Sequence, residues 1–351
     1  MASIESNRAA WLVSERADPL QVSSGPDQTK AEENEVIIRV AAIAINPSEP
    51  HIQAIGISFL QLKFPHVLGS DIAGTVVKVG SNVSLFQPGD RVIGHCLGLM
   101  HGGARHGGFQ EFAACLQTTV AKIPESLPFA HAAVLPLSIS TSATALYEHL
   151  QLRQPTVEPT KTGKDVVLIW GGATSIGSSA IQMAVASGYK VITTASAKNH
   201  EYVKSLVVTG KEDVTVLDYA DADISRKIIA HIKDHGLDFS GVYDCVSKET
   251  TVRVCVEVAG TFGGHLVSTV LPGVTSPRED VELRLVWATS AGMVADGGQL
   301  IWKNFVTPAL ENGTLKAKPE PQIVGEGLEK IQEAMNLYKK GVSATKLVVT
   351  L

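Results

Sequence analysis

The residues best suited to chemistry in this 351-residue chain form a glycine-rich turn, Gly171-Gly-Ala-Thr-Ser-Ile-Gly177, directly after the apolar run Val166–Trp170. An apolar run without alternation predicts a strand buried on both faces of a parallel sheet. Residues 178–188 then place apolar side chains at helical spacing. A strand, a glycine turn and a helix start form the corner at which a dinucleotide pyrophosphate binds, because the first N–H groups of a helix have no partners within it.

The turn departs from the dinucleotide fingerprint G-x-G-x-x-G, because Thr174 occupies the central glycine position. A Cβ there moves the phosphates outward, but the hydroxyls of Thr174 and Ser175 offer them hydrogen bonds. The alternative is an ordinary glycine turn of an unrelated α/β protein. The nucleotide interpretation assigns five residues to the cofactor: Gly172, Ala173, Thr174, Ser175 and Ile176.

A second apolar run, 190–195, ends in Ser196-Ala-Lys-Asn199, roughly where an NAD enzyme carries an acid for the ribose hydroxyls. No acid is present. The hydroxyl of Ser196, the ammonium of Lys198 and the amide of Asn199 suit a 2′-phosphate instead, which predicts NADPH. The alternatives are a solvated Lys198 and a helix-capping Ser196. Tyr219, two residues beyond a third strand, is expected to flank the adenosine, with core packing as its alternative.

Composition limits the function further. The net charge of −5, without a basic cluster, argues against nucleic acid and anionic membranes as partners. The N-terminus has no apolar signal core, and no run approaches about 18 apolar residues, so we expect a cytoplasmic protein without a membrane span. The four cysteines lack C-x-x-C spacing and are expected to be free, reduced thiols, with a single cysteine nucleophile as the alternative.

Three stretches of the chain differ in their patterns. The first, up to about residue 140, has short strand-like runs and turn signals, which predict a β-barrel-like domain: 35–45, 74–79 and 91–94. The second alternates strands with helical patterns, which predicts a parallel sheet with strands at 166–170, 190–195, 214–217, 241–245 and 265–269. The tail holds an amphipathic helix, 327–340, and a strand, 345–351, that we expect to complete the N-terminal barrel.

Six motifs occur in series: Asn46-Pro-Ser, Leu68-Gly-Ser-Asp-Ile-Ala-Gly74, Pro88-Gly-Asp-Arg-Val-Ile-Gly94, Gly107-Gly-Phe-Gln-Glu-Phe112, the nucleotide corner, and Gly341-Val-Ser-Ala-Thr-Lys-Leu-Val-Val349. With them the chain resembles, essentially end to end, a medium-chain dehydrogenase/reductase. It is most similar to the zinc-free branch of quinone reductases and to the fungal stand-alone enoyl reductases that serve polyketide synthases.

This resemblance implies two domains. A GroES-like β-barrel domain, for substrate and catalysis, would comprise residues 1–140 and 308–351. A Rossmann-like doubly wound parallel sheet, for NADPH, would comprise residues 141–307, giving an α/β fold overall. Further cofactor contacts are assigned by the resemblance to Ser48, Thr269, Val270, Val342 and Ser343.

The resemblance also bears on zinc. Zinc-dependent members carry Cys where this chain has Asn46, and His-Glu where it has Ser70-Asp71. Asn46 and Ser70 cannot supply the thiolate or imidazole that a catalytic zinc needs. The four closely spaced cysteines of a structural zinc lobe are missing as well. Three histidines, His95, His101 and His106, lie close in sequence, but loop histidines are usually solvated, so we expect no metal.

Without a metal, hydride addition to an activated C=C or reduction of a quinone is favoured over reduction of a simple carbonyl, because the developing charge is delocalised. The stretch Ser138–Ser142 resembles the one that faces the nicotinamide, which makes Thr141 a candidate hydrogen-bond donor to the enolate oxygen. Capping of a helix start by Thr141 is the alternative.

One departure concerns His51. The fungal enzymes commonly have Asn-Pro-Ser/Thr-Asp-x-Lys, whereas this chain has Asn46-Pro-Ser-Glu-Pro-His51. An imidazole can donate a proton near neutral pH, so His51 is a candidate acid, a shorter hydrogen-bond donor, or a structural residue.

Two classes of function follow. The first is an NADPH-dependent reductase of an enoyl or enone substrate, either a small molecule or one bound to a carrier of a polyketide synthase, with quinone reduction as a variant. The second is a cofactor-binding protein with a non-redox role, such as cyclisation or scaffolding. Both retain the nucleotide corner, so the sequence does not separate them.

Overall fold

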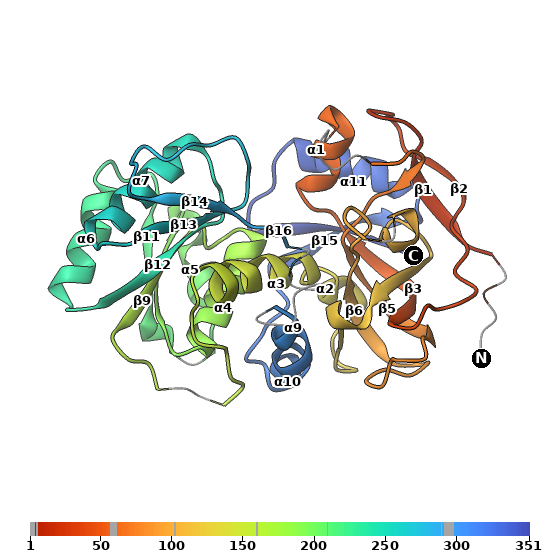
Figure 1. The fold of residues 1–351 in the computed structure, drawn as a ribbon, viewed down its shortest axis with the longest axis horizontal. Coiled ribbons are helices and arrows are strands. Elements are labelled where there is room, and N and C mark those ends of the chain that lie inside the picture. Colours follow the sequence, from red (N-terminus) through yellow and green to blue (C-terminus); the bar gives the residue numbers. More distant parts are fainter. Residues whose placement is uncertain are drawn as a thin grey trace. The chain divides into compact units, whose positions relative to one another are not determined.

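A computed structural model describes residues 4, 6–56, 62–101, 103–158, 161–208, 210–288, 290 and 298–351. The chain forms two compact units (Figure 1). Unit 1 comprises Met1–Leu137 and Glu320–Leu351, and unit 2 comprises Ser138–Pro319.

Unit 2 is built on one parallel sheet of six strands. Its strands are β9 (Asp165–Trp170), β10 (Lys190–Ala195), β11 (Val214–Asp218), β12 (Asp238–Asp244), β13 (Leu266–Thr269) and β14 (Glu282–Leu285). Their order is β11-β10-β9-β12-β13-β14, and every pair is parallel. The order reverses between β9 and β12, as in doubly wound dinucleotide-binding folds. The predicted Rossmann-like sheet is therefore confirmed.

Helices alternate with these strands along the chain. They are α4 (Ser175–Ala186), α5 (His200–Lys204), α6 (Ile224–Asp234) and α7 (Glu249–Thr261). Helix α4 packs on β9 and β10, and α7 packs on β12 and β13. Four of the six residues of β9, Val166–Ile169, are fully buried, because helices cover a sheet of this kind on both faces.

The described part of unit 2 also contains α9 (Gly298–Ile301), α10 (Thr307–Asn312) and two π-helical stretches, Thr144–His149 and Trp302–Val306. Residues 308–319, which the sequence assigned to the barrel domain, lie with unit 2. Two hydrogen bonds join this segment to unit 2, between Lys316 and the α4 residue Gln182. The Lys316 N–H donates to Gln182 Oε1 at 2.7 Å, and Gln182 Nε2 donates to the Lys316 carbonyl at 3.3 Å.

Unit 1 is mostly antiparallel. A seven-stranded sheet has the order β15-β16-β3-β5-β6-β8, with β7 also paired to β3, and a three-stranded sheet has the order β2-β1-β4. The strands are β1 (Arg8–Leu12), β2 (Gln21–Ser24), β3 (Glu35–Ala44), β4 (His66–Val67), β5 (Asp71–Val79), β6 (Arg91–His95), β7 (Phe112–Leu116), β8 (Val120–Lys122), β15 (Glu320–Glu326) and β16 (Thr345–Thr350).

Four helices accompany these sheets: α1 (Ser48–Ile55), α2 (Phe129–Ala132), α3 (Pro136–Ala143), whose C-terminal part belongs to unit 2, and α11 (Lys330–Lys339). Short 3-10 turns occur at Gly103–His106 and Gln117–Thr119 in unit 1, and at Ala197–Asn199 and Lys211–Asp213 in unit 2.

The C-terminus completes the unit 1 sheet. Figure 1 shows the C-terminal strands β15 and β16, in blue, in the same unit as β3, and β16 lies between β15 and β3 in the sheet. Strand β16 pairs antiparallel with β3, with Val349 opposite Ile43. Ile331 and Met335 of α11 are fully buried in the same core as Ile43. The expected closure of the barrel by the last strand is therefore observed.

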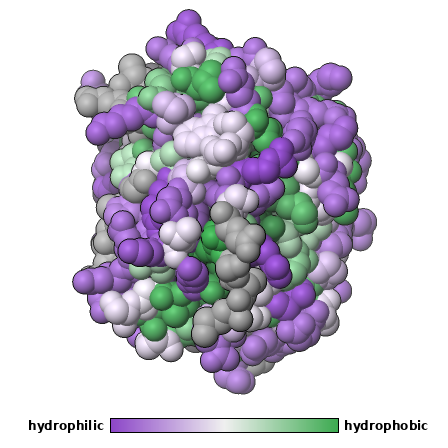
Figure 2. Space-filling view, turned by 90° about the vertical axis from the view of Figure 1, so that its right-hand side faces the viewer, coloured by the Kyte–Doolittle hydropathy of each residue, from purple (hydrophilic) through white to green (hydrophobic). Residues whose placement is uncertain are grey.

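The surface of unit 1 is mixed in character. On the face shown in Figure 2, hydrophobic residues form small groups separated by hydrophilic ones, as is usual for protein surfaces. Within the described residues, one helical run, Phe129–His149, has the length and hydropathy of a membrane span, but 78% of its most apolar window is buried. Such burial is the property of a core helix, so this run is weak evidence for a membrane.

A buried ion network fixes the loop before β7 against β3. The Glu35 side chain is only 2% exposed and lies 2.6 Å from Arg105 Nη2 and 2.7 Å from His106 Nε2. Burial acts to raise the pKa of Glu35, but hydrogen bonds from His106 and Arg105 outweigh it and lower that pKa to about 2.

Because this pKa lies below the ordinary value of 4.5, the ionised Glu35 should stabilise the fold above about pH 4.5. The contribution, about 3 kcal/mol, is lost as the pH falls toward 2. We expect Glu35→Gln to lower the melting temperature at pH 7 and to show a weaker acid dependence than the unchanged protein. The exposed Glu249→Gln is the control, and equal acid dependence in all three would contradict the assignment.

Candidate active site

The glycine turn after β9 is closed by its own hydrogen bonds. Gly171 has a φ of +85°, and its N–H donates to Thr194 Oγ1 at 3.1 Å. Thr174 caps helix α4, because its Oγ1 accepts from the Gly177 N–H at 3.0 Å. The same hydroxyl donates to the Gly171 carbonyl at 2.8 Å. In this conformation Thr174 holds the turn together, and its hydroxyl proton is not directed to a ligand.

Close packing explains the glycines at both ends of the motif. A Cβ on Gly172 would lie 2.3 Å from Thr193 Oγ1, and a Cβ on Gly177 would lie 2.3 Å from the Gly171 carbonyl oxygen. Neither strand nor helix can retreat without breaking the sheet or the cap. The start of α4 is therefore held directly against the end of β9.

Ser175 supplies the unsatisfied polar group at this corner. Its Oγ is buried and has no hydrogen-bond partner. It opens the twelve-residue helix α4, whose first-turn N–H groups have no carbonyl partner inside the helix. An anion accepts from N–H groups and is favoured by the positive end of the helix dipole. The residues present at this corner therefore fit the pyrophosphate of a dinucleotide.

The predicted 2′-phosphate residues lie beyond the carboxyl end of β10. Ser196 is half-buried and Lys198 is exposed. Ala195 pairs with Asp218 of β11 in parallel register, so Ser196 and Tyr219 leave the same edge of the sheet side by side. Tyr219 is 51% exposed, which rules out the core-packing alternative for its ring. A ring at this edge is available to stack on an adenine.

Two further candidates, Thr269 and Val270, lie at the carboxyl end of β13, at the same edge. Thr269 is 2% exposed, and the Val270 N–H donates to Ser247 Oγ at 2.8 Å. The carboxyl end of β13 lies two strands from β9 in the sheet. Ligands of doubly wound sheets bind along this edge, where the strand order reverses.

The other predicted site residues are divided between the units. Ser48, His51, Val342 and Ser343 belong to unit 1, whereas Thr141 belongs to unit 2. His51 is exposed on α1, and Thr141 is 8% exposed on α3. Ser48 Oγ is buried without a partner, as Ser175 Oγ is.

A buried polar cluster beside α1 was not anticipated from the sequence. Asn46 Nδ2 donates to Asp71 Oδ2 at 2.9 Å, and Lys346 Nζ lies 3.0 Å from the same oxygen. Lys346 Nζ also donates to Asn46 Oδ1, and the Asn46 N–H donates to Glu49 Oε2 at 2.6 Å. The sequence signal for this cluster is weak: an acid after Asn46-Pro-Ser, Glu49, a second acid in the predicted barrel, Asp71, and a lysine in the last apolar run, Lys346. Their meeting requires three segments distant in sequence.

The candidate metal residues are engaged elsewhere. His95 and His106 are each 1% exposed, so the expectation of solvated loop histidines was wrong for both. His106 bonds Glu35, and burial lowers the pKa of His95 to about 4. The four cysteines are free and buried, with Cys96 Sγ 3.5 Å from Cys115 Sγ. Among the described residues, no three His, Cys, Asp or Glu side chains are grouped to hold a metal.

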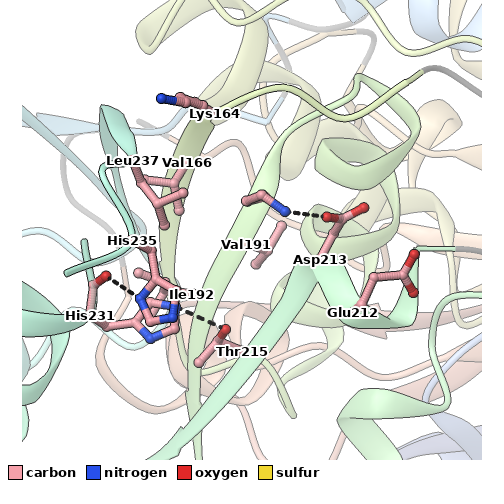
Figure 3. Close-up of a pocket in the computed structure, with 11 residues that line it drawn as sticks. Lys164, Val166, Val191, Ile192, Glu212, Asp213, Thr215, His231, His235 and Leu237 are labelled. Carbon is pink, nitrogen blue, oxygen red and sulfur yellow. Dashed lines mark hydrogen bonds and ion pairs between the residues drawn. The ribbon is translucent and has the colours of Figure 1, made fainter. Parts of the chain in front are cut away.

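Unit 2 also contains a cavity of about 310 Å³. Figure 3 shows residues from the amino-terminal ends of three strands around it, including Lys164, Val191 and Asp213, with His231 and His235 from the end of α6. The nucleotide turn follows the carboxyl end of β9, at the opposite edge of the sheet. This cavity is therefore not part of the nucleotide site.

The comparisons with known proteins agree with this geometry. Residues 32–125 match the alcohol dehydrogenase GroES-like domain. The trans-enoyl reductase himH of Aspergillus japonicus is 41% identical over 98% of this chain and 97% of its own length. The CurK enoyl reductase has the same fold, with a TM-score of 0.74, 22% identity and coverage of 99% of both chains. The quinone oxidoreductase of Pseudomonas syringae pv. Tomato DC3000 has a TM-score of 0.71, 21% identity and coverage of 98% of this chain and all of its own.

A doubly wound sheet with a nucleotide turn, together with a GroES-like unit, defines a nicotinamide-dependent oxidoreductase fold. The chain belongs to the medium-chain dehydrogenase/reductase family, within which it resembles fungal trans-enoyl reductases and quinone reductases.

The close approach at Gly177 yields a test of the nucleotide turn. Gly177→Ala should cost about 1–3 kcal/mol of stability, because its Cβ meets a backbone carbonyl that cannot move freely. We expect melting several degrees lower and weaker dinucleotide binding by calorimetry. Gly163→Ala is the matched control, because its nearest neighbour would be 3.8 Å away. Unchanged melting and binding in Gly177→Ala would show that the turn is arranged differently.

Proposed function

We propose that this protein is an NADPH-dependent, zinc-independent reductase that delivers hydride to an activated C=C, an enoyl or enone group, in fungal-type secondary metabolism. The main support is the nucleotide corner with Ser175 and the exposed Lys198, in a chain 41% identical to a trans-enoyl reductase. The substrate is a small molecule or an acyl group bound to a carrier of a polyketide synthase, which is what the resemblance to fungal stand-alone enoyl reductases implies. The reaction is placed in the cytoplasm.

The chemistry follows from what the residues offer. Asn46 and Asp71 are joined to each other and to Lys346 by hydrogen bonds, and Asn46 is a poor zinc ligand. Conjugate reduction needs less electrophilic assistance than reduction of an isolated carbonyl, because the enolate spreads its charge over three atoms. Hydrogen-bond donors of neutral side chains are enough to stabilise such an oxyanion.

The nicotinamide of NADPH supplies the hydride when bound. The residues of the chain bind and orient it: Gly172–Ile176 for the pyrophosphate, Ser196, Lys198 and Asn199 for the 2′-phosphate, and Tyr219 for the adenine. Ser48, Thr269, Val270, Val342 and Ser343 complete the proposed contacts. Thr141 donates a hydrogen bond to the developing enolate oxygen, and His51 donates the proton or a second hydrogen bond.

Two alternative functions can be distinguished from the proposed one by experiment. The fold similarity to a quinone oxidoreductase supports quinone reduction at the same site. A cofactor-binding protein with a non-redox role, in cyclisation or as a scaffold, would bind NADPH without consuming it. NADPH consumption with a panel of enones, enoyl thioesters and quinones decides among the three, with a chelator added to each assay. The proposal would be overturned if none of the substrates on the panel caused NADPH consumption. It would also be overturned if the protein contained one zinc per chain and lost both the zinc and its activity on chelation.

The cofactor preference has a direct test at Lys198. Lys198→Ala should weaken NADPH binding by about 1.5–3 kcal/mol, roughly ten- to hundredfold, because a charged hydrogen bond to the 2′-phosphate is lost. NADH affinity should not change. Calorimetry with both cofactors measures this, and Lys204→Ala, an exposed lysine on α5, is the matched control. Equal affinity of the unchanged protein for NADPH and NADH would refute the 2′-phosphate site.

Catalysis is tested at the two candidate donors. Thr141→Val and His51→Ala should each lower turnover by about 10²–10³ if they stabilise the oxyanion. Melting temperature should change little for His51→Ala, because His51 is exposed. A merely structural His51 would give the reverse, with lower melting and unaltered turnover per folded molecule. Full activity in both variants would remove them from the mechanism and direct attention to the end of β13.

A further inference from the structure

The buried cluster beside α1 contains more negative than positive charge. Its members, Asn46, Glu49, Asp71 and Lys346, are 2%, 1%, 0% and 4% exposed. Two carboxyl groups and a single ammonium are therefore buried together. An isolated charge in such a place is strongly disfavoured unless it is paired or neutralised.

The Lys346 ammonium contacts only one of the two carboxyl groups. Asp71 accepts from Asn46 Nδ2, from Lys346 Nζ and from the Leu137 N–H, the last at 2.5 Å. Glu49 accepts from the Asn46 N–H at 2.6 Å, and Asn46 Nδ2 is 3.5 Å away. Lys346 is thus engaged by Asp71 and by the Asn46 amide, whereas Glu49 has no cation at hydrogen-bond distance among its described contacts.

Among the described residues, the titratable neighbours His95 and Tyr338 do not supply a second positive charge. Burial holds the pKa of His95, on β6, at about 4, so this imidazole is neutral at pH 7. Tyr338, on α11, is half-buried, and burial together with the charge of Glu49 raises its pKa. For Glu49 itself, burial and then the Asp71 charge raise the pKa to about 7, against the opposing effect of Lys346.

We infer that the cluster of Asn46, Glu49, Asp71 and Lys346 holds one proton in weakly acidic solution, on Glu49, and that this proton positions the start of helix α1. When the proton is lost, an uncompensated negative charge is buried in the first turn of α1, the helix that also carries Ser48 and His51. Asp71 is bonded to Leu137, in the first turn of α3, the helix that carries Thr141. Glu49 and Lys346 are therefore positioning residues, and only the part of the inference that concerns turnover rests on the proposed function.

Stability measurements test the proton without any substrate. The folded pKa of Glu49, about 7, exceeds its ordinary value of 4.5. The folded protein therefore binds the extra proton between these values, and stability is lost as the pH rises through that window. We expect the melting temperature of Glu49→Gln, relative to the unchanged protein, to rise by several degrees from pH 5 to pH 8. The exposed Glu311→Gln should parallel the unchanged protein. Parallel curves for Glu49→Gln would overturn the inference.

Two measurements keep the test decisive if Glu49→Gln does not fold. Infrared spectra of the unchanged protein should show a protonated carboxylic acid band at pH 6 that disappears by pH 8.5. Lys346→Met should shift the loss of that band to higher pH, because the opposing cation is removed. An unchanged protein without such a band at pH 6 would refute the buried proton.

A positioning role predicts that the cluster affects the pH dependence of turnover, which a merely structural cluster would not change. In the unchanged protein kcat/KM should fall as the pH rises through about 7, and this fall should persist in His51→Ala but disappear in Glu49→Gln. The opposite pattern would overturn the positioning role. If no substrate on the panel is reduced, the proposed function fails, and the melting and infrared results alone decide the inference.

Discussion

The contact between the Lys346 ammonium and the Asp71 carboxylate, 3.0 Å apart and almost fully buried, constrains much of unit 1. Lys346 lies on the last strand, 275 positions after Asp71, so the chain must return to its first unit before either charge is compensated. Strand β16 then pairs with β3, and α11 adds Ile331 and Met335 to the barrel core. The nucleotide unit is consequently an insertion into the barrel unit, and both chain termini belong to the latter.

A second constraint acts in unit 2, where backbone atoms approach too closely for a side chain. Gly177 places the first turn of α4 against the Gly171 carbonyl, and Thr174 closes the same turn with its hydroxyl. This packing points the start of the helix at the edge where the strand order reverses. Threonine at the central glycine position is therefore accommodated by a structural role in the cap, and Ser175 is the hydroxyl left without a partner.

These two constraints have a common consequence for the chemistry. Lys346 and the Asn46 amide contact the Asp71 carboxylate beside α1. At this place unit 1 therefore offers hydrogen-bond donors and acceptors, not thiolate or imidazole ligands. In the proposed function, such a site would serve reactions whose developing charge is delocalised. The similarity to fungal trans-enoyl reductases and to quinone reductases agrees with that preference, since both substrate classes accept hydride at a conjugated system.

Much of the fold was predictable because it depends on local pattern. Val166–Ile169 form an uninterrupted apolar run, so a doubly covered strand was expected there, and the order of strands and helices in unit 2 followed from their spacing. The association of residues 308–319 with unit 2 was not predictable from local pattern, because it involves tertiary contacts such as the hydrogen bond between Lys316 and Gln182 on a distant helix. The prediction that His95 and His106 are solvated was wrong for the same reason, because the burial of a side chain depends on which distant segments pack over it.

The candidate site, like the fold, was predictable from the sequence only in part. Sequence alone determined the strand, glycine turn and helix start around residues 166–178 and the absence of an acid in Ser196–Asn199, because both are contiguous segments whose chemistry is local. Tertiary structure alone decided that Tyr219 is exposed, that Thr174 caps a helix, and that Glu49 shares a buried site with Asp71 and Lys346. The physical reason is that desolvation and charge pairing depend on which segments meet in three dimensions, and one-dimensional spacing does not specify that meeting.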